Sequence, residues 1–319
     1  MPNSDLLIKV REQEFTALLD RDKIVADIRQ HLRPWTDLVQ DVVNYGSNLI
    51  PRCFTSSERD LKDAIVLAIL LRQVVAMLDA VDVLLSNGAA HAAQLQVRAL
   101  FEASVYLEWI LQGDSGKKAS YYYVHNLRRK RLWASRTQQG SAESSEFIAM
   151  MNNSGLPVDD KLHEAGRQQI EEIDRVLSQP ELSAINADFE QNRKGKRNDP
   201  AWYVPLGQRS FRTIAKAVGR ESEYTIFYSG ASEVMHTSSY DPHVKVGKGE
   251  LTFEPIRSLE GIQNVFRFSV GLAFRTFRRV LEEYRAGELA AFSRKYLEKW
   301  QKEFLNFPEI KYEMQATRI

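Results

Sequence analysis

The chain lacks the cysteines of a disulfide-stabilised protein, a secretory signal and a large net charge. Cys53 is its only cysteine among 319 residues, which excludes an intramolecular disulfide and a zinc site built from cysteines alone. The N-terminal stretch is amphipathic and acid-bearing, unlike the apolar core of a secretory signal. With a formal net charge of +1, no overall charge draws the chain to nucleic acid or to an anionic membrane. We therefore expect a cytoplasmic protein in a reducing compartment, with no membrane association.

Common catalytic motifs are also missing. The sequence contains no HExxH zinc motif, no Walker A loop and no GxSxG elbow. Glu233-Val-Met-His236 is a lone ExxH, whereas a di-iron bundle needs two such motifs and further glutamates. We accordingly expect no metal and no cofactor.

Apolar runs with helical spacing fill most of the chain and predict an all-α fold. The longest, Ala64–Leu85, is interrupted by Arg72, Asp79 and Asp82. Each such charge costs about 2.5–3.5 kcal/mol near a bilayer centre, so we interpret this run as a core helix of a bundle. Helices at about 57–86 and 89–112 are joined by the turn Asn87-Gly88, which predicts a central antiparallel hairpin.

Other helices are expected around this hairpin, in one domain spanning 1–319. A helix opened by Pro34 should stop before Pro51, and another opens at Pro180. Polar helices suggest a peripheral helical insertion at about 141–207. Further helices are predicted at 117–139, 221–238, 258–285 and 288–305, with one small β-hairpin near 243–253.

Arg98 and Glu102 form the first candidate site. They are spaced i, i+4 on the otherwise apolar helix 89–112, so they can share a face and pair. A buried pair adds little net stability, because desolvation offsets the attraction. The pair could brace this helix against a neighbour, or it could serve catalysis.

Tyr228, Ser232 and His236 form the second candidate site. Their i, i+4, i+8 spacing aligns them on one helix face, next to the small residues 229–231. Histidine can act as a general base near neutral pH. The alternative is a satisfied core histidine at a Ser/Thr-rich helix end.

The third candidate set follows the central hairpin and comprises Tyr122, His125, Arg128 and Arg129. Interleaved aromatic and basic residues suit contacts to phosphates and bases. The alternative is an ordinary solvated basic face.

Two resemblances follow from these residues. Arg98-Ala-Leu-Phe-Glu102, followed much later by Tyr228-x3-Ser232-x3-His236, resembles a widespread bacterial helical family catalogued as a domain of unknown function, which implies an all-α fold over roughly 60–285. More loosely, the chain is similar to HEPN proteins, helical bundles that include dimeric, metal-independent ribonucleases of toxin–antitoxin and anti-phage systems. Their hallmark is an Arg followed after four to six residues by a His on one helix; here Arg98 and His236 lie on different predicted helices.

Three hypotheses follow. In the first, the chain is a nuclease-like effector that cleaves RNA or another phosphodiester. His236 would be the general acid or base, Arg98 would stabilise the phosphate charge, and Glu102 would orient Arg98 or His236. The substrate-binding residues would be Tyr228, Ser232, Tyr122, His125, Arg128 and Arg129. In the second, it is a non-catalytic interaction protein with a buried polar network and a protein partner. In the third, it is a metal-dependent hydrolase using Glu102, His236 and either Asp241 or His125.

Self-association into a homodimer is a further expectation. It rests on the many aromatic side chains of the two last helices, which exceed what one core obviously needs; they are Phe266, Phe268, Phe274, Phe277, Phe292 and Trp300. The alternative is packing of the same side chains in the core of a single chain.

Overall fold

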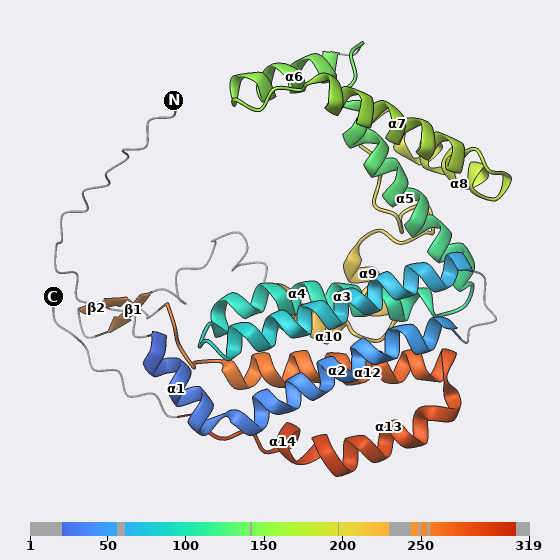
Figure 1. The fold of residues 1–319 in the computed structure, drawn as a ribbon. Coiled ribbons are helices and arrows are strands. Elements are labelled where there is room, and N and C mark those ends of the chain that lie inside the picture. The colour runs from blue at the N-terminus through green and yellow to red at the C-terminus, as the bar shows by residue number, and fades with distance from the viewer. Residues whose placement is uncertain are drawn as a thin grey trace.

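In the computed structural model, the predicted hairpin lies at the centre of an all-α body. The structure describes residues 21–55, 61–140, 142–196, 198–229, 244–247, 250–253 and 256–310. Helices α3 (Leu61–Leu85) and α4 (Ala90–Ile110) pack antiparallel, and α2 (Arg33–Thr55) and α12 (Ile262–Tyr284) pack beside them (Figure 1). The predicted all-α fold is confirmed.

Apolar side chains on every side of α3 and α4 explain their central position. Val74, Leu78 and Val81 of α3, and Leu100 and Phe101 of α4, are fully buried. Burying one such side chain contributes about 1.5–3 kcal/mol. By length and composition, Ala64–Leu85 could also cross a bilayer, and half of it is buried inside the bundle.

The turn between α3 and α4 is fixed by its glycine. Gly88 has a φ of +68°, and a Cβ there would lie 2.5 Å from Cγ2 of Ile24 on α1 (Arg21–His31). The amide of Ser258 donates to the Gly88 carbonyl, which ties the chain preceding α12 to this turn. The prediction that Asn87-Gly88 ends the helix is confirmed.

Proline gave one wrong expectation and one correct one. Helix α2 does not stop before Pro51 but contains it and continues to Thr55. The fully buried Leu49 and Cys53 anchor the helix on both sides of Pro51, so tertiary packing outweighs the lost backbone hydrogen bond. Pro180, in contrast, opens α8 (Pro180–Arg193) in its first turn, as predicted.

The last helices cover the body on the side of α2 and α12. After the short η2 (Ala286–Glu288), they are α13 (Leu289–Lys295), the π-helical η3 (Tyr296–Trp300) and α14 (Gln301–Leu305). Five of the six aromatic side chains on which we based self-association are buried within this single chain, and Phe268 is packed against the core. They therefore provide no exposed surface for a dimer, and the dimer itself stays a prediction.

An arm of helices projects from the body (Figure 1). Helix α5 (Ser115–Ser135) leads outward and carries α6 (Ala142–Asn153), α7 (Asp160–Leu177) and α8. Helix α7 packs closely on the end of α5, where a Cβ on Gly166 would lie 2.3 Å from Oγ1 of Thr137. The boundaries of the insertion expected at 141–207 remain a prediction.

The predicted β-hairpin is present. Strand β1 (Val244–Gly247) pairs antiparallel with β2 (Glu250–Phe253), with Val244 opposite Phe253 and Gly247 opposite Glu250.

Candidate functional site

Tyr228 brings Arg98 and Glu102 of α4 together. A short α9 (Phe211–Ala217) and one turn, α10 (Glu221–Glu223), lead into the π-helix η1 (Tyr224–Tyr228), which packs on α4. Nη2 of Arg98 donates to the Tyr228 hydroxyl at 3.1 Å, and this hydroxyl donates to Oε2 of Glu102 at 3.3 Å. The Arg98 guanidinium also lies 4.2 Å from the Tyr228 ring centroid. The phenol thus links the two charges that we expected to pair. Single-turn π-helices are frequent at functional sites.

The Arg98 guanidinium has a donor left over. Among the described residues, its Nη1 is buried and has no hydrogen-bond partner. Leaving a buried donor unsatisfied costs about 1–3 kcal/mol or more when it is charged, so it requires an explanation. An anionic oxygen placed beside Nη1 would satisfy this donor.

Glu102 lies among phenols that stay neutral. Burial, and then the negative charge of Glu102, raise the pKa of Tyr228 to about 12, although Arg98 partly opposes the shift. Burial and the Glu102 charge likewise raise the pKa values of Tyr106 and Tyr203 above their usual range. Phenols in this state can donate hydrogen bonds to a bound group but do not act as bases at neutral pH.

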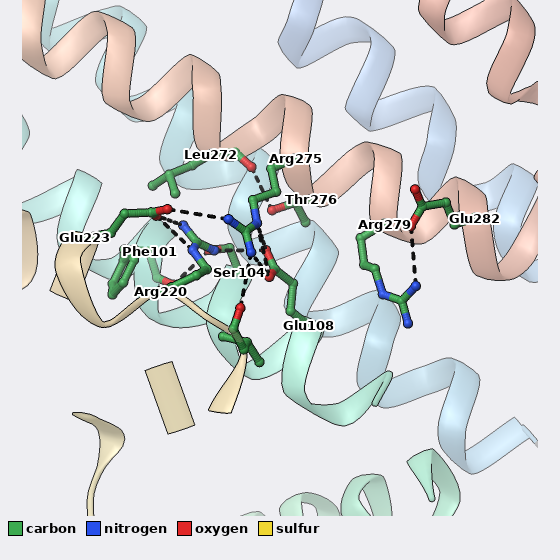
Figure 2. Close-up of polar contacts among 11 residues, drawn as sticks. Phe101, Ser104, Glu108, Arg220, Glu223, Leu272, Arg275, Thr276, Arg279 and Glu282 are labelled. Carbon is green, nitrogen blue, oxygen red and sulfur yellow. Dashed lines mark hydrogen bonds and ion pairs between the residues drawn. The ribbon is translucent and has the colours of Figure 1, made fainter. Parts of the chain in front are cut away.

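A second network, centred on the buried side chains of Arg220 and Glu108, lies beside this cluster and was not predicted (Figure 2). Arg220 is completely buried, and its Nη1 donates to Oγ of Ser104 at 2.8 Å and to Oε1 of Glu108 at 3.0 Å. Its Nε donates to Oε2 of Glu223 at 2.8 Å. Arg275 of α12 donates from Nε and Nη2 to the same Glu108 carboxylate. The buried pair of Arg220 and Glu108 is thus completed by two partly exposed charges, Glu223 and Arg275.

Local sequence explains why Arg220 turns inward. Gly219, with a φ of +73°, ends α9, and the amide of Arg220 donates back to the Ala215 carbonyl at 2.7 Å. The guanidinium then lies 4.7 Å from the centroid of the Phe101 ring, and that ring also contacts Tyr228 at 5.9 Å. The buried network thereby supports the helix turn that carries Tyr228.

The third candidate set divides between two environments. Arg128 is buried, and its five N–H groups all have acceptors, on Asp199, Asn186 and Glu190. His125 packs against Phe189, and burial lowers its pKa to about 4. Both side chains hold α5 against α8 and the loop that follows.

Tyr122 and Arg129 lie elsewhere on α5. The Tyr122 ring packs edge-on against Trp202 at 5.2 Å, and burial together with the Glu102 charge raises its pKa. Tyr122 therefore belongs with the Glu102 cluster, whereas Arg129 is exposed.

Three residues of the hypotheses, Ser232, His236 and Asp241, lie outside the described residues. Within the described part of the chain, no group of three or more His, Cys, Asp or Glu side chains is arranged to hold a metal ion.

The comparisons with known proteins identify a family. Residues 64–250 match the family of unknown function DUF5677, so the chain belongs to that family. The matched segment includes α4, the arm and η1. No curated protein and no solved structure matches the chain.

Proposed function

We propose that this member of the DUF5677 family binds a phosphodiester at the cluster of Arg98, Glu102 and Tyr228 and cleaves RNA there. The observation that carries the proposal is the buried Nη1 of Arg98, which has no partner among the described residues. A guanidinium presents its donors in a planar fork that matches phosphate oxygens. One arm of the fork is held by Tyr228, and the other remains for the ligand.

The proposed roles follow from this arrangement. Arg98 stabilises the negative charge that develops on the phosphate, and Glu102 holds Arg98 through the Tyr228 hydroxyl. Tyr228 and Ser232 position the substrate, and His236, eight residues after Tyr228, serves as general acid or base.

The HEPN resemblance fits this proposal in chemistry but not in layout. Here the arginine comes from α4, and the histidine comes from the chain after η1, instead of both lying on one helix. By this analogy the biological role is that of a cytoplasmic effector in a toxin or anti-phage defence system.

A second candidate function is a non-catalytic interaction protein. It is favoured by the complete internal pairing of Arg128 and Arg220, whose charges brace the fold and face no ligand. In this case the Arg98 cluster is a further brace, and the projecting arm receives a protein partner.

Cleavage of a labelled single-stranded RNA by the purified chain tests the proposal. We expect Arg98→Ala and His236→Ala to abolish cleavage, while Arg33→Ala, which removes an arginine that is 76% exposed, leaves it unchanged. A thermal melt of each variant separates lost chemistry from lost folding. Full cleavage by well-folded Arg98→Ala or His236→Ala protein would contradict the proposal, and cleavage that disappears with a metal chelator would favour the metal-dependent alternative.

A further inference from the structure

The four basic residues 128–131 of α5 fall into two pairs, one bound to carboxylates of the arm and one not. Arg128 pairs with Asp199 and Glu190, and Arg131 pairs with both carboxylate oxygens of Asp174. These two cations are neutralised by the arm itself.

The other two cations of the run face solvent. Arg129 and Lys130 are exposed, and neither forms an ion pair with a carboxylate in the described part of the chain. Four residues after Arg129, Trp133 is 56% exposed, although tryptophan is usually well covered. The Arg136 guanidinium lies 4.1 Å from the centroid of the Trp133 ring. The outer face of α5 thus presents a half-exposed indole with Arg136 on its ring, and Arg129 and Lys130 precede it by about one helical turn.

We propose that this outer face, formed by Arg129, Lys130, Trp133 and Arg136, binds single-stranded RNA. Exposed aromatic rings stack unpaired bases, and neighbouring cations attract the phosphates between them. The inference rests on the proposed function for the choice of RNA, and it adds where the strand lies outside the cleavage site.

The direction of the strand follows from the helix. Tyr122, Asn126, Arg129, Trp133 and Arg136 recur at alternating spacings of four and three residues, so they lie along one side of α5. Tyr122, at the end of α5 nearer the body, packs against Trp202, which also contacts Tyr106 of α4. With a rise of 1.5 Å per residue, Trp133 lies about 16 Å further along the helix. A strand bound on this side therefore runs from the arm towards Arg98.

Helix α7 of the arm supplies a matched control. Lys161 and Arg175 on α7 are exposed cations outside this face. The double variants Arg129→Ala/Lys130→Ala and Lys161→Ala/Arg175→Ala each remove two exposed positive charges from the arm. A difference in RNA affinity between the two double variants is therefore due to the outer face of α5 and not to the net charge of the chain.

Fluorescence anisotropy tests the inference with the full chain and a labelled, 2′-O-methylated oligouridine of about 12 nucleotides. The methylation prevents cleavage, so binding is measured whether or not the chain is a nuclease. We expect Trp133→Ala to weaken binding about tenfold, within the range for loss of one stacked base. Trp133→Phe should retain part of the affinity. Arg129→Ala/Lys130→Ala should reduce the slope of log affinity against log salt by about 1.4, since each phosphate contact contributes about 0.7.

Three outcomes would overturn the inference. They are no binding by the unmodified chain, unchanged binding by Trp133→Ala, and equal weakening by the two double variants. Binding on this face without any RNA cleavage would support the inference and contradict the proposed catalytic function.

Discussion

Removing Glu108 should destabilise the protein more than removing any exposed charge. The side chain is 6% exposed and is the shared acceptor of two guanidinium groups, one of which, Arg220, is fully buried. In Glu108→Ala, Arg220 keeps Glu223 and Ser104, but among the described residues Glu223 is then the only carboxylate left beside the guanidinium groups of Arg220 and Arg275. Breaking a buried ion pair by removing one partner costs about 3–5 kcal/mol when the remaining charge is left uncompensated, and because Arg220 keeps Glu223 we expect the lower end of this range.

Replacing Arg275, the more exposed partner of Glu108, gives a loss of stability with which the Glu108→Ala loss can be compared. The Arg275 side chain is 43% exposed, so water solvates part of its charge. Pairs of this exposure contribute about 0–1 kcal/mol, and Glu108 keeps Arg220 when Arg275 is replaced. We therefore expect Arg275→Ala to cost at most a third of what Glu108→Ala costs.

Urea unfolding followed by circular dichroism measures both values, with the slope confirming that each variant unfolds in one step. Glu164→Ala is the control, because Glu164 contacts Arg167 and Gln168 at the exposed surface of α7, and its loss should leave the free energy of unfolding nearly unchanged. If Glu108→Ala costs no more than Arg275→Ala, the buried charges do not hold α4, α10 and α12 together as argued.

Two further predictions concern the arm and the core. Burial, followed by the charge of Arg129, lowers the pKa of His125 to about 4, so the folded state resists protonation. The free energy of unfolding should therefore fall as the pH drops from about 6.5 towards 4. We expect a loss of about 1–2 kcal/mol between pH 7 and 5, after allowing for the partial exposure of the ring. Urea unfolding across this pH range measures the loss, and His125→Gln should remove it. A Cβ on Gly46 would lie 2.4 Å from Cζ of Phe277, so Gly46→Ala should lower the free energy of unfolding by about 1–3 kcal/mol. Gly116→Ala on α5, where the nearest atom is 3.9 Å away, should instead raise it by about 0.5–1 kcal/mol; equal effects of the two substitutions would contradict the close packing at Gly46.

The fold was predictable because its signals are local. Both core helices carry apolar residues on all sides, and the dipeptide Asn87-Gly88 marks the turn between them. Such patterns need no knowledge of distant partners. Pro51 misled the prediction because a local rule was outweighed by the packing of the residues on either side.

The site was predictable only in part, because its contacts join distant residues. The charges of Arg98 and Glu102 stand out in an apolar helix, and both contact Tyr228 of the second candidate set. Glu108 lies in the same apolar stretch and carried the same signal. Its partner Arg220, 112 residues later, has no periodicity or motif that marks it as buried.

The basic run shows a related limit. Helical spacing places Arg128 and Arg129 about 100° apart, but it does not say which of them faces inward. That depends on α7 and α8, which follow later in the chain and supply Asp174 and Glu190.

The pairing of Arg128 also has a mechanical consequence. Its guanidinium joins α5 to α8 and to the chain at Asp199, while Gly166 lets α7 sit directly on the end of α5. These contacts join the C-terminal half of α5 to α7 and α8, so we expect the three helices to move as one unit and a pull applied near the tip of the arm to be transmitted along α5. Since α5 follows α4 after only a few residues, such a pull would act directly on the helix that carries Arg98 and Glu102.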